Sequence, residues 1–450
     1  MRRIVFHFLV ACSLLGTAAT ATRPHYGGTL RVTLQSVPGT LDIPANAATA
    51  DYWDSTRVFA LVTDNLISMD PQGRPQPALA LAWQNDSNAR HWQFTLRRGV
   101  KFHDGSALSA AALAQILAPL HPDWHMQSSG DTLTIDTDNP LPFLLAELAL
   151  PRNVVLKRAA NGLPVGTGTF RIVEFQPGKL LKLSANEECW SGRPYLDAIE
   201  IEFGRPLRDQ AIALELSRTD VIEVSPAASN SASARVRTSL PLELMALVFP
   251  PNSKAQDPRV REALSLSIDR RPIQSVLLKG AGDPAGSLLP NWMTGYSAVF
   301  TGQPNVQRAK ALLADSRQPA FTLSYDPRDP QAQLIAERIA LNAREAGITL
   351  QVSLSGADDV RLVRVVLPSP DPATALREVA RQLGGPQPTA RSNAVEDLYQ
   401  AERAILDGHS VIPLFHLPVA SAAGARVRDW GPDRRGEWNL PQVWLEADSR

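Results

Sequence analysis

The sequence predicts an α/β protein built from mixed, twisted sheets with helices packed on them. Between residues 246 and about 414, segments with alternating apolar residues are followed by segments with apolar residues at helical spacing, which favours an α/β lobe. The chain has 450 residues, 44% hydrophobic and 20% charged, so it is long enough for two or three domains with well-filled cores. Its 45 basic residues balance its 45 acidic residues, which leaves no global field to recruit nucleic acid or anionic lipid.

The first 21 residues have the three parts of a signal peptide. Two arginines follow the first methionine, residues 4–16 are largely apolar, and Ala19-Thr20-Ala21 offers small residues for cleavage. No later stretch approaches the roughly 20 uninterrupted apolar residues that span a bilayer, so we expect an exported protein. Cleavage after Ala21 is favoured over acylation of Cys12, because the residues after Cys12 stay apolar whereas a lipoprotein tether is polar.

Short strands and turns dominate the first half of the mature chain. Residues 30–34 alternate apolar and polar side chains, and so do residues 92–97, as in strands with one wet face. Asp104-Gly105 then turns the chain, because glycine accepts backbone angles that other residues resist. The other elements expected here are a helix over 55–66, an extended link over 71–77, a strand at 133–135, an apolar helix over 140–150, strands at 170–175, 180–184 and 199–203, and a loop with a short helix over 225–239.

An aspartate followed by proline marks three expected helix starts in the second half. Asp257-Pro258, Asp329-Pro330 and Asp371-Pro372 each place a side-chain acceptor before a proline that suits the first helical turn. Glycines at 347 and 384 are expected to end the second and third of these helices. Strands are expected at 321–325, 348–352, 362–367 and 411–415, and a final helix at 401–406.

Six segments in order carry a family resemblance. They are GGTLRVTLQSVPGTLD, DNLISMDPQGRPQPALALAW, WQFTLRRGVKFHDGS, GTGTFRIVEFQPGKLLKLSANEECWSGRPYLDAIEIEF, DPRVREALSLSIDRRPI and AILDGHSVIPLFH. Together they resemble the family 5 extracellular solute-binding proteins, which are the oligopeptide- and dipeptide-binding components of ABC importers. The likeness covers nearly the whole mature chain.

The resemblance implies a two-lobed periplasmic-binding-protein-like fold of the class II type with an extra subdomain. Crossover strands would join the lobes, and the ligand would be enclosed between them. The divisions expected are residues 1–21 as signal peptide, residues 22–65, 165–245 and 415–450 as lobe I, residues 66–164 as a small subdomain packed on lobe I, and residues 246–414 as lobe II.

For function, the resemblance implies a protein that is not an enzyme and needs no cofactor. It would act in the periplasm as a monomer, close on a small solute (peptide-like, sugar or chelate) and deliver it to ABC permease subunits in the membrane. No G-x-S-x-G, H-E-x-x-H or P-loop motif and no paired-cysteine metal site occurs in the sequence. The alternative is a degenerate member that serves as an envelope scaffold, chaperone or sensory module without import.

Positions that line the cleft in this family give the candidate ligand contacts. The candidates are Tyr52, Trp53, Phe249, Phe415, His416 and Asp371. Aromatic walls suit sugars, apolar side chains or peptide planes, and the alternative for each aromatic is a core or surface position. Trp292 faces the cleft or packs under a loop. The spacing of His121 and His125, with Pro122 between them, indicates a surface loop rather than a metal site.

One departure from the family bears on the ligand. Peptide-binding members carry an acidic residue that holds the ligand's α-ammonium, and here Pro368 falls at that position. Asp371 lies nearby, but its simpler interpretation is the N-cap of the helix that starts at Pro372. Because a buried cation without an anionic partner is costly, we do not expect peptides with a free α-amino group to be the ligand.

Overall fold

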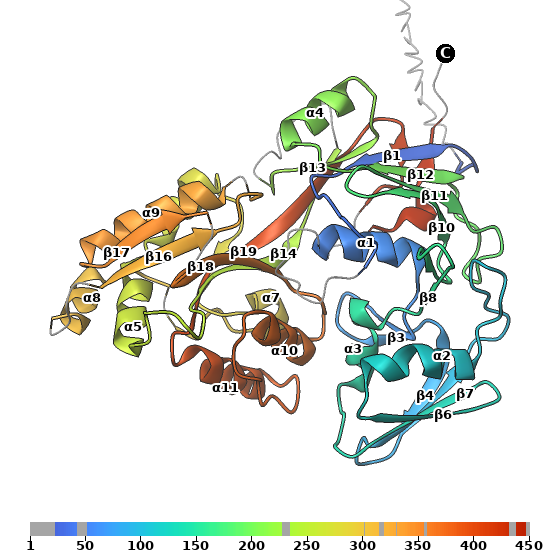
Figure 1. The fold of residues 1–450 in the computed structure, drawn as a ribbon, viewed down its shortest axis with the longest axis horizontal. Coiled ribbons are helices and arrows are strands. Elements are labelled where there is room, and N and C mark those ends of the chain that lie inside the picture. Colours follow the sequence, from blue (N-terminus) through green and yellow to red (C-terminus); the bar gives the residue numbers. More distant parts are fainter. Residues whose placement is uncertain are drawn as a thin grey trace, which may run out of the picture.

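Two long strands run through the middle of the protein and belong to both of its halves. They are β14 (Arg235–Val248) and β19 (Val411–Ala423), which pair antiparallel in the computed structural model. Figure 1 shows them crossing from one half to the other. The structure describes residues 23–42, 52–226, 235–300, 302–314, 319–329, 331–354, 358–431 and 438–446. Within these ranges no helix is long and apolar enough to span a bilayer.

β14 and β19 form the centre of one sheet that continues into each half. Among the described residues it has eleven strands, with β15 (Asp283–Pro284) paired to the side of β19. The order of the others is β10 (Phe170–Gln176), β11 (Leu180–Ala185), β12 (Ala198–Glu202), β1 (Thr29–Thr33), β13 (Val221–Val224), β19, β14, β18 (Val360–Val366), β16 (Ala320–Tyr325) and β17 (Thr349–Ser353). Parallel and antiparallel pairs both occur, which confirms the predicted mixed sheet.

The first lobe surrounds the end of this sheet that holds β1 and β10 to β13. Its core contains Leu30 and Val32 from β1, together with Ile199 and Ile201 from the neighbouring β12. The remaining elements of this lobe are α1 (Tyr52–Val62), α4 (Leu207–Glu215), β20 (Val427–Arg428), η5 (Leu440–Gln442) and β21 (Trp444–Leu445).

A small subdomain has a core of its own, built on a four-stranded sheet among the described residues. Trp92, Phe94 and Leu96 point into that core from one face of β5, as their alternation predicts. The sheet order is β4 (Ala80–Asn85), β5 (His91–Leu96), β7 (Thr132–Thr137) and β6 (Trp124–Ser129). The other elements are β2 (Ile67–Met69), β3 (Pro75–Pro77), α2 (Ala110–Leu117), η1 (Ala118–Leu120), α3 (Leu144–Leu148), η2 (Pro151–Asn153), β8 (Lys157–Arg158) and β9 (Pro164–Val165).

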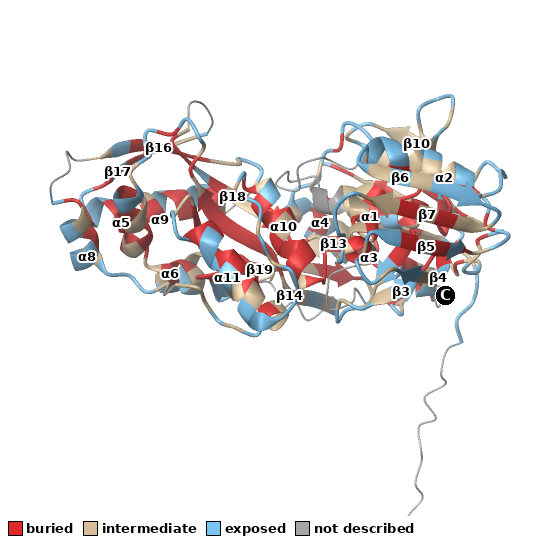
Figure 2. Ribbon diagram, turned by 90° about the horizontal axis from the view of Figure 1, so that it is seen from below, coloured by how far each residue is buried: buried red, intermediate tan, exposed pale blue. Residues whose placement is uncertain are grey.

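The second lobe has a core on each face of its part of the sheet. Along β14, Leu244 and Ala246 enter one core while Met245 and Leu247 enter the other, because successive side chains of a strand point to opposite faces. Figure 2 shows that buried residues dominate the strands in the middle of this lobe. The covering elements are α5 (Pro258–Ser267), α6 (Arg270–Pro272), the π-helix η4 (Ile273–Leu277), α7 (Asn291–Thr294), α8 (Val306–Leu312), α9 (Ala332–Glu345), α10 (Pro372–Gln382) and α11 (Val395–Leu406).

Five expectations about local structure were wrong. The helix cap expected at Asp329 is not formed, because α9 begins at Ala332 with Gln331 as its N-cap residue. Residues 235–239 lie in β14 rather than in a loop, while residues 227–234 are outside the described part. The apolar helix over 140–150 is reduced to α3 because Pro140, Pro142 and Pro151 flank it. Residues 75–77 are not a simple link but the second strand of the β2–β3 hairpin. His125 lies on β6 and not in a loop, since the turn at Gly130 folds β6 back onto β7.

Candidate functional site

A cavity of about 370 Å³ lies where the first lobe, the small subdomain and the second lobe meet. The first lobe supplies residues from α1, and the small subdomain supplies residues around Ile67. The second lobe supplies Trp292 from α7 and the segment 366–370 that connects β18 to α10. We name this the main cavity. Because its walls come from both lobes and the small subdomain, its shape depends on how closely these three parts approach one another.

Two tryptophans line the main cavity. The indole Nε1 of Trp292 donates to the backbone carbonyl of Pro241 at 3.0 Å, which fixes the ring against β14. Trp438 enters from the carboxyl-terminal segment, and the guanidinium carbon of Arg57 lies 5.2 Å from the centre of its ring. Flat apolar rings next to a few polar groups are typical of sites for small solutes.

The main cavity carries little charge. Arg57 and Asp64 are the charged side chains among its described lining residues. One carboxylate oxygen of Asp64 accepts hydrogen bonds from the Thr167 hydroxyl at 2.7 Å and from the Trp190 indole at 2.9 Å. Burial raises the pKa of Asp64, although these hydrogen bonds and nearby positive charge oppose the rise. A ligand here therefore meets mainly apolar and neutral polar groups.

The segment that precedes α10 contributes no carboxylate to the cavity wall. Val366, Leu367, Pro368, Ser369 and Pro370 line it. The next residue, Asp371, is buried and caps the helix instead. Its Oδ1 accepts from the backbone N–H of Thr374 at 2.9 Å, and its Oδ2 accepts from the Asn393 amide. The N-cap interpretation of Asp371 is confirmed.

A second cavity of about 690 Å³ adjoins the main cavity, because both are lined by Phe59, Pro151 and Val154. It is much more polar. Asp42 and Arg158 form an ion pair at its edge. The remaining charged groups form one connected chain from the small subdomain to α10.

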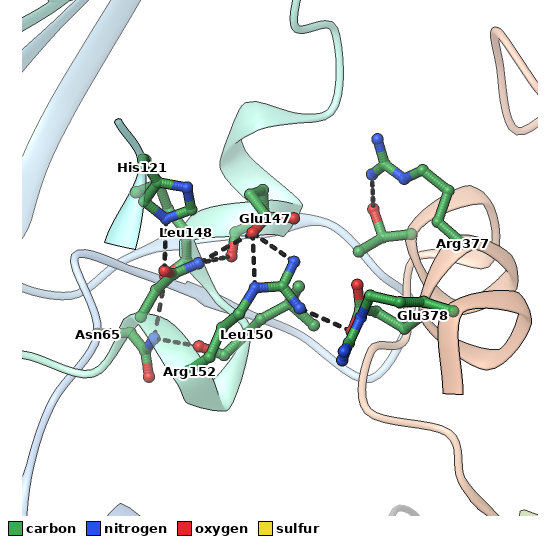
Figure 3. Close-up of polar contacts among 11 residues, drawn as sticks. Asn65, His121, Glu147, Leu148, Leu150, Arg152, Arg377 and Glu378 are labelled. Carbon is green, nitrogen blue, oxygen red and sulfur yellow. Dashed lines mark hydrogen bonds and ion pairs between the residues drawn. The ribbon is translucent and has the colours of Figure 1, made fainter. Parts of the chain in front are cut away.

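Figure 3 shows that chain of polar contacts. In the small subdomain, His121 Nε2 lies 2.7 Å from the Asn153 side-chain oxygen, and Asn153 donates to the Glu147 carboxylate at 3.2 Å. Glu147 also accepts from Arg152 at 2.6 Å. Arg152 reaches across to Glu378 on α10. His121 is therefore a structural residue, and its ring also stacks on Trp124 at 3.6 Å.

Three of the sequence candidates lie in the core of the second lobe. Phe415 is fully buried, and Phe249 packs in the same core under the guanidinium of Arg261. His416 is buried with its Nε2 3.2 Å from the carbonyl oxygen of Leu288. None of the three lines either cavity, so as ligand contacts they stay a prediction.

The other two aromatic candidates, Tyr52 and Trp53, are the first residues of α1, and their side chains lie outside the described part. Arg57, Asp64 and Trp438 were not foreseen as cavity residues. Asp64 lies in the short link between α1 and β2, two residues after the helix ends, which is the one local signal that could have identified it. Within the described ranges, no cluster of three or more His, Cys, Asp or Glu side chains could hold a metal ion.

Comparison with known proteins identifies the family. The model of the bacterial extracellular solute-binding proteins, family 5 Middle, matches residues 74–364. The chain is 25% identical over 339 residues to the nickel-binding protein NikA of Staphylococcus aureus, covering 69% of this chain and 68% of that protein. It is 24% identical over 406 residues to the probable di/tripeptide-binding protein 5 of Pseudomonas aeruginosa, covering 76% of each.

Solved structures agree on the fold. NikA of Staphylococcus aureus, in complex with Ni(L-His)2, superposes with a TM-score of 0.79 at 19% identity, covering 93% of this chain and 100% of that chain. The dipeptide-binding protein of Pseudoalteromonas sp. SM9913, in complex with Met-Leu, gives a TM-score of 0.79 at 18% identity with the same coverage. The architecture is thus the two-lobed fold of periplasmic binding proteins, as predicted. The chain belongs to the bacterial extracellular solute-binding proteins of family 5.

Proposed function

We propose that the protein captures a small solute in the main cavity outside the cytoplasm and passes it to the membrane subunits of an ABC importer. The observation that carries this proposal is a cavity with walls from both lobes and the small subdomain, beside two strands that connect the halves. Bending of those strands changes the distance between the walls, and a solute that contacts all of them stabilises the closed form.

The solute we infer is compact, has an apolar or flat surface, and carries no isolated positive charge. The aromatic side chains of Trp292 and Trp438 suit such a surface. The wall at Pro368 offers no carboxylate to an ammonium group, and Asp371 is committed to its helix cap. The one carboxylate among the described lining residues, Asp64, already accepts hydrogen bonds from Thr167 and Trp190. Both metal–amino-acid chelates and peptide-like molecules with a blocked amino end meet this description, as relatives bind nickel or peptides.

A thermal-unfolding screen tests the proposal. Ni(L-His)2, blocked and free dipeptides, and small sugars are added to the purified protein, and a ligand at 100 times its dissociation constant should add about 2.7 kcal/mol to the free energy of unfolding. Trp292→Ala should abolish the shift, whereas Trp83→Ala, a change in the small subdomain away from the cavity, should retain it. A shift that survives Trp292→Ala would place the solute elsewhere.

Location outside the cytoplasm follows from the family, and export by a signal peptide over residues 1–21 belongs to the proposal. Amino-terminal sequencing of the mature protein should begin at Thr22. A lipid-modified amino terminus at Cys12 would instead support membrane anchoring. A scaffold or chaperone role without import does not require a cavity lined by both lobes and the small subdomain. A sensory module would also bind a solute, and recovery of permease subunits in a pull-down would count against it.

A further inference from the structure

The small subdomain contacts the second lobe along α10 and the residues just before it. A Cβ atom at Gly73, in the β2–β3 turn, would lie 2.9 Å from the carbonyl oxygen of Pro370, so the two backbones touch there. One helical turn into α10, the guanidinium carbon of Arg377 lies 5.1 Å from the centre of the Phe143 ring. These contacts bring α10 against the subdomain beside both cavities.

An ion pair completes this interface. Nη1 of Arg152 in the subdomain lies 2.6 Å from a carboxylate oxygen of Glu378 on α10. The Glu378 side chain is 7% exposed, so the pair is screened less than a surface pair would be. Neighbouring Arg381 and Arg152 lower the pKa of Glu378 despite its burial, which keeps the carboxylate charged.

Arg152 and Glu378 each form a second ion pair, Arg152 within the small subdomain and Glu378 within the second lobe. Arg152 binds Glu147 of the subdomain at 2.6 Å, and Glu378 binds Arg381, three residues further along α10, at 2.8 Å. When the bodies separate, neither charge loses all of its partners. The usual penalty for an uncompensated buried charge is therefore avoided, and the cross-body bond can break and form again.

We propose that Arg152 and Glu378 form a reversible latch that holds the small subdomain against α10 and so raises the population of the closed form before any solute binds. The inference rests on the proposed function, because closure matters there for capture. The apparent affinity for a solute is the intrinsic affinity multiplied by the fraction of protein in the competent form. The latch would thus raise the apparent affinity for a solute through a contact between the small subdomain and the second lobe.

Distances between spin labels in solute-free protein test the latch. Labels at Ser129→Cys in the subdomain and Lys310→Cys in the second lobe, both exposed, report the separation in a Cys189→Ser background. We expect a dominant short distance in the parent protein. Glu378→Gln and Arg152→Gln should each raise the ratio of long to short distances about tenfold, and the double variant should add little to either.

Arg381→Gln is the matched control. It removes an ion pair of Glu378 on the same helix but leaves the cross-body bond, so the short distance should persist. Identical distance distributions for the parent and Glu378→Gln, or equal opening by Arg381→Gln, would overturn the latch. Circular dichroism verifies that each variant is folded. Because no solute is present, failure here is independent of failure of the thermal screen.

Discussion

The carbonyl oxygen of Leu288 lies 3.2 Å from Nε2 of buried His416. The backbone N–H of Leu288 donates to the carboxylate of Glu402, which is fully buried. The same carboxylate also accepts from the backbone N–H of Leu289 at 3.1 Å. Two titratable side chains thus hold one short segment that leads to α7 and Trp292. Burial lowers the pKa of His416 to about 4 and raises the pKa of Glu402 to about 7.

We predict that these two groups oppose each other in the pH dependence of stability. His416 has an ordinary pKa of 6.5, so its contribution is present above pH 6.5 and is lost as the pH falls towards 4. Glu402 has an ordinary pKa of 4.5, so its contribution is present below pH 4.5 and is lost as the pH rises towards 7. Each change amounts to roughly 3 kcal/mol, and in the intact protein the two largely cancel.

Single variants separate the two contributions. Relative to the parent, His416→Gln should become less stable as the pH rises from 4.5 to 7, and Glu402→Gln should become less stable as the pH falls from 6.5 to 4. Urea unfolding at half-unit pH steps measures both slopes. Parallel profiles for the two variants would show that these side chains do not titrate as inferred.

The helix cap at Asp371 gives a second prediction. Asp371→Ala removes the acceptor for the Thr374 N–H and the contact with Asn393, which should lower the free energy of unfolding by about 1–2 kcal/mol. Asp371→Asn keeps an acceptor oxygen and should recover most of that loss. A variant Asp371→Asn that is stable but has lost binding of a solute found in the thermal screen would show that the carboxylate holds a ligand cation.

Close packing at Gly166 gives a third prediction. A Cβ atom there would lie 2.0 Å from the carbonyl oxygen of Val62 at the end of α1, a distance that no side chain tolerates. Gly166→Ala should therefore lower the free energy of unfolding by about 3 kcal/mol or prevent folding. Gly408→Ala is the control, because nothing lies within 4 Å of its added Cβ. Equal denaturation midpoints for the two variants would contradict the close approach.

The separate core of the small subdomain gives a fourth prediction. Phe94→Ala should cost about 3–5 kcal/mol because it leaves a cavity in that core, whereas Thr95→Ala, on the exposed face of the same strand, should change little. Hydrogen exchange should show faster opening of β5 and β7 in Phe94→Ala, with the amides of β16 and β17 unaffected. Uniform acceleration in all four strands would mean that the subdomain and the second lobe unfold together.

The predictions that depend on local sequence patterns were the most reliable ones. The alternation of Trp92, Phe94 and Leu96 and the caps at Asp257 and Asp371 depend on neighbouring residues, and all were found as predicted. The strand at 235–239 was missed, since its stability comes from pairing with β19 some 180 residues away. Arg57 and Trp438 were missed as residues of the predicted cleft for the same reason. The walls of the main cavity bring together Arg57, Trp292 and Trp438, which no pattern within a segment connects.

The central place of β19 also determines when the protein can fold. β19 lies near the carboxyl end of the chain, yet it stands between β13 and β14 and supplies the ladder partner of each. A nascent polypeptide has to leave the ribosome almost entirely before that ladder can form. Until β19 is available, β13 can pair only with β1 and β14 only with β18, so the sheet that joins the two lobes stays divided into two parts.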